Sequence, residues 1–393
     1  MGTASTMACL TAALGLIPLK GASAPAVSAL RLRIAEETGR NAVEAAKHGR
    51  TPQKIMSRES IFNAITVLQA IGGSTNGIVH LMAIVNRHPE LQGHITLDDI
   101  DAIGKKTPLI VDLKPSGDNY MNDFHNAGGM LALLHTLRPL LHLSAMTITG
   151  ETVEAILDST PFKPFPYSLE IIRPLSNPLA KDSSLVVLRG NLAPHGAIMK
   201  ASASKDRALL AHTGAAVVFR NTADLAVRID DPDLEVTPSS VLVLQNVGPI
   251  GNPGMPEAGL IPIPRKLASQ GTMDMLRISD GRMSGTAGGT IVLHIAPESA
   301  QIDSVLGIVK DGDMITCNVE ERTLKLQVDE SEIKRRMSER SDQLLEKTNK
   351  ATEPSVLVAR KTRRGYRGLY ERSVNQAHLG ADFDFLTASG PTE

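Results

Sequence analysis

The apolar side chains of the first 150 residues recur mainly at helical spacing. Residues 24–48 carry one such pattern and stop at Gly49, and residues 58–70 carry a second. Residues 7–24 predict a buried helix followed by a loop, and residues 130–142 predict another helix. This part of the chain is therefore expected to be largely helical.

One short run in this half has the character of a strand. Residues 107–113 (TPLIVDL) are apolar and are followed by a Gly-, Asn- and Asp-rich turn at 114–129. Together with the helices around it, this run predicts an α/β layer.

The pattern changes after the proline-rich connectors between residues 161 and 184. Short β-branched runs separated by turn residues then predict a mostly β, barrel-like region, and residues 329–350 predict a charged helix. The predicted strands are 185–188, 215–219, 240–244, 276–279, 290–295 and 323–328. We therefore predict two domains, an incomplete N-terminal α/β domain at 1–165 and a C-terminal domain at 166–393.

Composition excludes several classes of protein. The 393 residues are 42% hydrophobic and 21% charged with a net charge of −1, so there is no electrostatic footprint for nucleic acid. No apolar run is long enough to span a bilayer. Two cysteines, Cys9 and Cys317, argue against a disulfide framework. They are also too few for the usual ligand set of an iron–sulfur or structural zinc site.

The stretch at 70–85 (AIGGSTNGIVHLMAIV) combines capping residues with an apolar helix. Ser74, Thr75 and Asn76 are all helix-capping types. The pattern predicts either a capped core helix or a helix whose amino end binds an anion, and the residues alone do not separate the two.

Three glycine-bearing loops are expected after strands of the second half, at 189–200, 245–259 and 279–290. Such loops need unusual backbone angles or a close approach to another group. Because all three carry polar residues, they are a candidate site if they converge.

Two of these loops carry candidate chemistry. Glu257 could bind a hard cation such as Mg²⁺, cap a helix or pair with Arg265. Ser284 lies in SDGRMSGTAGGT, which lacks the first glycine of a nucleophile elbow and the lysine of a phosphate-binding loop. Composition favours a helix N-cap for Ser284, and the loop could also present backbone N–H groups to a carboxylate.

Several longer motifs together resemble those of the dihydroxy-acid dehydratase / 6-phosphogluconate dehydratase family. The chain contains, in the order found in that family, GGSTNGIVHLMAI, NAGGM, GNLAPHGAIMK, GPIGNPGMPE and SDGRMSG. The segments LKPSGDNYMNDFHNAGG and GTAGGTIVLHIAPES are more similar to the sugar-acid members, such as pentonate dehydratases.

The resemblance implies a hydro-lyase that converts a 2,3-dihydroxy acid to a 2-keto-3-deoxy acid with Mg²⁺ and an iron–sulfur cluster. Ser284 matches the family's proton-abstracting serine and Glu257 matches a magnesium ligand. We further expect the backbone N–H groups of Gly285 and Thr286 to hold the substrate carboxylate.

The chain departs from the family at the cluster. The family's cluster cysteines and its other magnesium ligands precede the segment that resembles Met1–Leu16, and neither Cys9 nor Cys317 matches a ligand position. We therefore expect no cluster ligands in this chain and predict an N-terminal truncation.

Three functions stay open at this point. The first is a sugar-acid dehydratase whose activity is doubtful in this chain, and the main alternative is an inactive short paralogue that assembles with full-length dehydratase. The third is a chain that binds a hydroxy acid with a metal but does not turn it over. The chain is expected to form a homo-dimer or tetramer, to bind a small hydroxy acid and to bind neither nucleic acid nor membrane. The expected location is cytoplasmic or mitochondrial.

Overall fold

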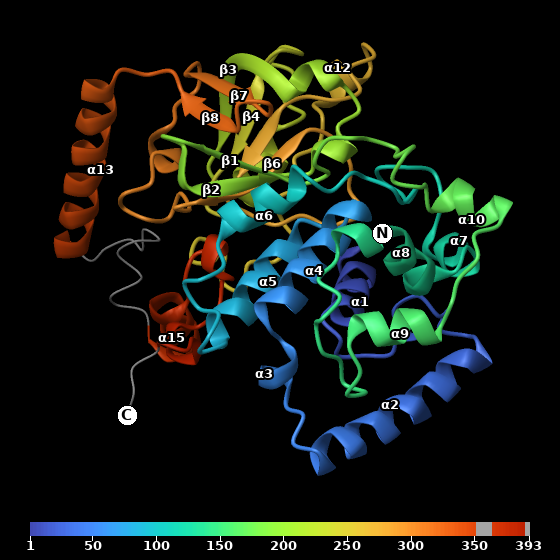
Figure 1. Cartoon of the computed structure of the whole chain (residues 1–393). Coiled ribbons are helices and arrows are strands. Elements are labelled where there is room, and N and C mark those ends of the chain that lie inside the picture. The colour runs from blue at the N-terminus through green and yellow to red at the C-terminus, as the bar shows by residue number, and fades with distance from the viewer. Residues whose placement is uncertain (351–363, 390–393) are drawn as a thin grey trace. The chain divides into compact units, whose positions relative to one another are not determined.

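The computed structural model describes residues 1–350 and 364–389, with the side chains of 344–350 left out of that description. The chain divides into two compact units (Figure 1). The first comprises residues 1–77 and 93–185, and the second comprises residues 78–92 and 186–393.

The first unit is helical. Its α-helices are α1 (Thr3–Ala13), α2 (Ala29–Lys47), α3 (Pro52–Ile55), α4 (Arg58–Ala70), α6 (Leu97–Gly104), α7 (Met121–Asn126), α8 (Gly129–Leu137), α9 (Val153–Ser159) and α10 (Pro166–Ile171), with 3-10 turns η1 (Leu19–Ala22) and η2 (Arg138–Leu140). The predicted helices at 7–24, 24–48 and 58–70 are confirmed as α1, α2 and α4. The helix predicted at 130–142 ends at Leu137, where the chain turns into η2 around Pro139, a residue that has no N–H to continue a helix.

The predicted strand at 107–113 forms only isolated bridges. Leu109 meets Ala180 and Val111 meets Ile172, each at a single position. The N–H groups of Ile110 and Val111 instead donate to the carbonyl of Ala70 at the end of α4. The first unit therefore lacks, within its described residues, the sheet of the predicted α/β layer.

The core-helix interpretation of residues 70–85 is supported within the first unit. The Thr6 hydroxyl accepts a hydrogen bond from the N–H of Ser74, and the Ser74 hydroxyl accepts one from the N–H of Asn76. Ser74, Thr75 and Asn76 are all buried. The start of helix α5 (Asn76–Arg87) is thus packed against α1, which leaves no observation in favour of an anion there.

The second unit is a closed eight-stranded barrel. Its strands are β1 (Val186–Gly190), β2 (Ala193–Met199), β3 (Ala211–Phe219), β4 (Val241–Leu244), β5 (Arg277–Ser279), β6 (Ile291–Ala296), β7 (Met314–Asn318) and β8 (Thr323–Leu326). They close in the order β1-β2-β6-β5-β4-β3-β7-β8. All six predicted strands are present, whereas β2 and β7 were missed. β2 occupies much of the segment 189–200, which was predicted to be a loop. The prediction failed there because Pro and Gly, which β2 contains, are typical of turns.

The helices of the second unit are short apart from α13. They are α11 (Thr222–Arg228), α12 (Arg265–Ala268), α13 (Glu330–Lys350) and α15 (Gly365–Ser373), with 3-10 turns η3 (Ala201–Ala203), η4 (Arg207–Leu210), η5 (Leu306–Ile308), η6 (Ala377–Leu379) and η7 (Asp384–Leu386). The predicted helix at 329–350 is confirmed as α13. Most of α5 also belongs to this unit, since Asn86 bonds the carbonyl of Leu379 and Arg87 makes a bidentate ion pair with Asp382.

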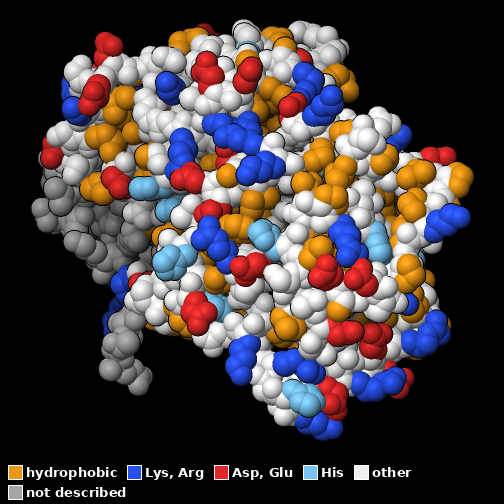
Figure 2. Space-filling view, viewed as in Figure 1, with side chains coloured by type: hydrophobic (Ala, Val, Ile, Leu, Met, Phe, Trp, Pro, Cys, Tyr) orange, Lys and Arg blue, Asp and Glu red, His pale blue; other side chains and the backbone are white. Residues whose placement is uncertain are grey.

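Aliphatic side chains fill the interior of the barrel, as in other small barrels. They include Val186, Leu188, Met199, Ala216, Val218, Val241, Val243, Ile278, Val292, Ile315 and Leu324. Figure 2 shows acidic and basic side chains interspersed over the visible face, in keeping with the near-zero net charge. None of the described helices is long and apolar enough to cross a bilayer.

A buried ion pair at the start of β5 is hydrogen-bonded to the residue that precedes β6. The Asp274 carboxylate lies 2.7 Å from the Arg277 guanidinium and also accepts hydrogen bonds from Thr290. Both charged side chains are almost fully buried. Removing one partner would leave an uncompensated charge in the interior.

We therefore expect Asp274→Ala to lower the free energy of unfolding by about 3–5 kcal/mol. Asp233→Ala, at an exposed position, is the matched control and should change it by less than about 0.5 kcal/mol. Urea denaturation followed by circular dichroism measures both. Equal effects in the two variants would contradict this account of the pair.

Candidate active site

The candidate site is built at the carboxyl ends of two neighbouring parallel strands. Leu244 of β4 pairs with Ser279 of β5. The loops at 245–259 and 280–290 therefore begin side by side at one edge of the barrel. Two of the three predicted loops thus converge, and they carry Glu257 and Ser284.

Asp280 is the first of several residues that hold these loops in place. Its carboxylate is fully buried and accepts hydrogen bonds from the N–H of Val247 (3.0 Å) and the N–H of Ser299 (2.8 Å), as well as from the Ser299 hydroxyl. Burial raises the pKa of Asp280 despite these donors. The side chain therefore ties together the loops that follow β4, β5 and β6.

Glu298 is a second buried carboxylate with the same role. It accepts hydrogen bonds from the N–H groups of Ile250 (2.9 Å) and Gly251 (2.8 Å) and from the Gln376 side-chain amide (2.7 Å). Burial and the nearby charge of Asp280 raise the pKa of Glu298 to about 7. Gly248 leaves room for this arrangement, because a Cβ there would lie 2.7 Å from a Glu298 oxygen.

Arg282 bridges the two loops directly. Its Nε donates to the carbonyl of Met255 at 2.7 Å, and its own carbonyl accepts from the N–H of Gly259 at 2.6 Å. Met255 itself has a positive φ of 43°, a conformation that L-residues seldom adopt. The loop that carries Glu257 is thus fixed on both sides of this residue.

Ser284 lies in a tight turn and is half-buried. Its Oγ is 3.0 Å from the Thr286 hydroxyl and accepts from the Thr286 N–H at 3.4 Å. No helix starts at this point, so the N-cap role favoured by composition is wrong. Local side chain-to-backbone bonds of this kind hold a serine in place without any helix.

Glu257 presents an exposed carboxylate on the neighbouring loop. Arg265, the ion-pair partner predicted as an alternative for Glu257, pairs with Asp230 at 3.3 Å. The Glu257 charge acts on His80 of α5, whose pKa is lowered by burial and by Arg282 and raised in part by Glu257. Glu257, Arg282 and His80 therefore share one electrostatic environment.

His294, which was not predicted from the sequence, lies in the same environment. The residue is 3% exposed, has a φ of 56°, and donates its backbone N–H to the carbonyl of Gly281. Neither ring nitrogen has a hydrogen-bond partner within the described residues. Burial, together with repulsion from Arg282 and His80, lowers the pKa of His294 to about 3. In the sequence, the only sign of this residue was a single polar side chain within the apolar run TIVLHI.

Lys200 was missed as well. It follows β2, whose Met199 pairs with Val292 of β6, and the turn after it bonds to the loop that carries Ser284 through the Gly289 N–H and the Ala203 carbonyl. Its ammonium group is buried and has no hydrogen-bond partner in the described part of the chain. Burial lowers the pKa of Lys200 to about 7.

Comparison with known proteins decides the family. Residues 1–156 match the model of the dihydroxy-acid/6-phosphogluconate dehydratase N-terminal domain, and residues 170–381 match that of the C-terminal domain. The chain belongs to the dihydroxy-acid/6-phosphogluconate dehydratase family. Matches to both domain models give no support to the predicted truncation.

Dehydratases of known name are similar along nearly the whole chain. An L-arabonate dehydratase from Azospirillum brasilense is 42% identical over 389 residues, covering 98% of this chain and 64% of the relative. A 6-deoxy-6-sulfo-D-gluconate dehydratase from Pseudomonas putida is 40% identical over 391 residues, covering 99% and 63%. A dihydroxy-acid dehydratase from Methanosarcina acetivorans is 36% identical over 385 residues, covering 98% and 65%. The chain thus spans less than two thirds of the length of these relatives, and none of them supports a mitochondrial location.

The residues of this dehydratase-family chain do not fit the iron–sulfur cluster that the family implies. Cys9 is a buried residue of α1 and Cys317 lies in the barrel core, and burial raises the pKa of each thiol to about 12. A cluster ligand must be a thiolate. Across residues 1–343 and 364–389, whose side chains the structure describes, no group of three or more His, Cys, Asp and Glu side chains is placed to hold a metal ion. Glu257 supplies one carboxylate, whereas Mg²⁺ takes six ligands.

We expect both thiols to resist modification by Ellman's reagent at pH 8 in the folded protein, because only the thiolate reacts and both are buried and protonated. Two equivalents should react once the chain is unfolded in guanidinium chloride. Fast labelling of one equivalent in the native state would show that one cysteine is an accessible thiolate. That cysteine would then be a candidate cluster ligand.

The raised pKa of Glu298 predicts a pH dependence of stability. Between the ordinary glutamate pKa of 4.5 and about 7, the folded protein holds a proton that the unfolded chain has released. Raising the pH through this window therefore lowers the free energy of unfolding. Glu298→Gln removes the titration, so we expect the stability of the wild type relative to this variant to fall from pH 4.5 to pH 7.5.

Glu320→Gln, at an exposed position, controls for the loss of one carboxylate. Chemical denaturation at several pH values measures all three proteins. A wild-type stability that rose relative to Glu298→Gln across this window would show that Glu298 is held as an anion.

Proposed function

We propose that this protein is a hydro-lyase that removes water from a 2,3-dihydroxy sugar acid and gives a 2-keto-3-deoxy acid. The match to both dehydratase domain models, with Ser284 fixed on the loop after β5, is the observation that carries the proposal. The names of the L-arabonate and 6-deoxy-6-sulfo-D-gluconate dehydratases support a sugar acid as the substrate class.

Ser284 is the proposed base. As an alkoxide, its Oγ takes the proton from C2 of the substrate, the C2–H electrons form a C2=C3 double bond, and the C3 hydroxyl leaves as water with the proton that Ser284 has taken, which restores the alkoxide. The resulting enol rearranges to the ketone. The Thr286 N–H donates to Ser284 Oγ, and the Thr286 hydroxyl lies 3.0 Å from the same oxygen, where it can donate to an alkoxide. Such donors stabilise negative charge on that oxygen and so favour its action as a base.

The proposed carboxylate site lies next to this base. Gly285 and Thr286 follow Ser284 directly, and backbone N–H groups in a turn are suited to hold a carboxylate. The Thr286 N–H already donates to Ser284 over a long 3.4 Å, so it can be shared with a ligand. Arg282, two residues before the base, adds positive charge to the same loop.

The family implies two cofactors, Mg²⁺ and an iron–sulfur cluster, and among its described residues this chain offers a ligand for Mg²⁺ but no thiolate for the cluster. Glu257 is the residue of this chain that we propose as a magnesium ligand, because it presents an exposed carboxylate on the loop beside Ser284. A homo-oligomer, either a dimer or a tetramer, remains part of the proposal.

Ser284→Ala is expected to lower the rate of keto-acid formation from L-arabonate by about 10²–10⁴-fold, the usual contribution of a general base. Ser269→Ala, at an exposed position after α12, is the matched control and should retain the wild-type rate. The keto acid is measured by its semicarbazone absorbance, with the full chain prepared anaerobically.

A Ser284→Ala variant as active as the wild type would remove Ser284 from the chemistry. Absence of product from the wild type on every aldonic acid tested would favour the alternative, an inactive chain that assembles with a full-length dehydratase. Size-exclusion chromatography with such a subunit would then test that assembly.

A further inference from the structure

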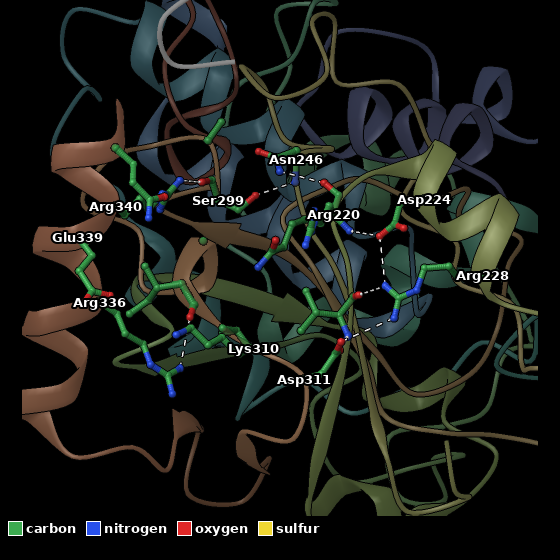
Figure 3. Close-up of a pocket in the computed structure, with 17 residues that line it drawn as sticks. Arg220, Asp224, Arg228, Asn246, Ser299, Lys310, Asp311, Arg336, Glu339 and Arg340 are labelled. Atoms are coloured by element: carbon green, nitrogen blue, oxygen red, sulfur yellow. Dashed lines mark hydrogen bonds and ion pairs between the residues drawn. The ribbon is translucent and has the colours of Figure 1, made fainter. Parts of the chain in front are cut away.

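The second unit contains a cavity of about 910 Å³ that holds neither Ser284 nor Glu257 (Figure 3). Val218 at the end of β3 and Gln245 and Asn246 after β4 line part of it. Figure 3 shows Arg336 and Arg340 projecting from α13 on one side, with Arg228 of α11 on the other. A cavity of this size can enclose a small ligand.

Positive side chains predominate in its lining. Five cations face three acids there, namely Arg220, Arg228, Lys310, Arg336 and Arg340 against Asp224, Asp311 and Glu339. Two of the arginines are already neutralised. Arg228 pairs with Asp224 and Asp311, and Arg336 makes a bidentate pair with Asp313. The other three cations, Arg220, Lys310 and Arg340, are not paired with a carboxylate of the cavity lining in this way.

Arg340 is held in the wall without a carboxylate. Its guanidinium donates to the main-chain carbonyls of Ser299 and Ser304. Burial lowers the pKa of Arg340, and the charge of Asp303 offsets this only in part. Gly307 is needed for this placement, since a Cβ there would lie 2.1 Å from an Arg340 nitrogen. A desolvated cation of this kind is costly unless an anion compensates it.

Arg220 and Lys310 are exposed in the same cavity. Neither side chain makes an ion pair with a carboxylate in the part of the chain that the structure describes. Both backbones are fixed, because the Arg220 carbonyl accepts from the Asn246 amide and the Lys310 N–H donates to Asp313. These two cations thus line the cavity from backbone positions that are held by hydrogen bonds.

We propose that this cavity binds a compact polyanion, a small molecule with two or more phosphate or carboxylate groups. Arg340 supplies a half-buried positive charge, and Arg220 and Lys310 supply two further, exposed cationic donors. Phosphate and carboxylate oxygens match guanidinium and ammonium donors and form stronger hydrogen bonds with them than neutral acceptors do. The site is separate from the proposed active site and does not depend on the proposed dehydratase activity.

Ligand binding here also touches the network that holds the active-site loops. The Asn246 N–H donates to the Ser299 hydroxyl, which donates to Asp280, and both Asn246 and Ser299 line the cavity. A bound polyanion is therefore expected to raise the melting temperature of the full chain as well as to bind.

Isothermal titration calorimetry of the full chain with inorganic pyrophosphate tests the proposal, with citrate and the neutral polyol erythritol as companion probes. We expect pyrophosphate to bind, with an affinity that falls as salt is added, and erythritol not to bind. The double variant Arg220→Gln/Lys310→Gln should bind at least about tenfold more weakly, because two charge-assisted hydrogen bonds are lost.

Arg265→Gln/Lys325→Gln removes the same charge at exposed positions outside the cavity and should bind within about twofold of the wild type. Thermal unfolding shows whether each variant is folded. Pyrophosphate without citrate binding would indicate a phosphate ligand, and binding of both would indicate any compact polyanion. No binding by the wild type, equal binding by the cavity variant, or equal weakening by the control would each overturn the proposal.

Discussion

The burial of two carboxylates, Asp280 and Glu298, is the constraint on which the candidate site depends. Between them they accept hydrogen bonds from Val247, Ile250, Gly251 and Ser299. These donors belong to loops after β4 and β6, while Asp280 itself follows β5. Loops rich in glycine lose much conformational entropy when they are ordered. Several strong acceptors in a dry interior offset that cost and hold Glu257 and Ser284 on a fixed frame.

The sequence predicted the barrel well and the first unit less well. Six of the strands are runs of β-branched residues bounded by turn signals, and each of these is present. β2 was missed because its sequence, APHGAIM, carries proline and glycine inside a strand whose register shifts at Gly196. The run at 107–113 is apolar because its side chains are buried, although it does not pair as a strand. The N–H groups of Ile110 and Val111 bond instead to the end of α4. Apolar runs this short do not distinguish the two cases.

Only part of the candidate site could be predicted from the sequence. Ser284 and Glu257 were found because they lie in glycine-rich loops and family-like motifs, and the structure brings those loops together. His80, His294 and Lys200 were missed because a single polar residue in an apolar run has no periodicity of its own. Their character appears only when burial is known, for it is burial that lowers the pKa of His294 to about 3 and that of Lys200 to about 7. The basic cavity likewise draws on residues from 218 to 343, which no local pattern could have joined.

Amide hydrogen exchange of an Asp280→Asn variant tests most directly whether these carboxylates hold the site. The account predicts that peptides covering 246–251, 280–290 and 298–301 lose protection together, while β3 and β7 keep theirs, because local opening releases the loops without opening the barrel. Loss of protection confined to the peptide that contains residue 280 would contradict it, since the loops would then be held by other contacts.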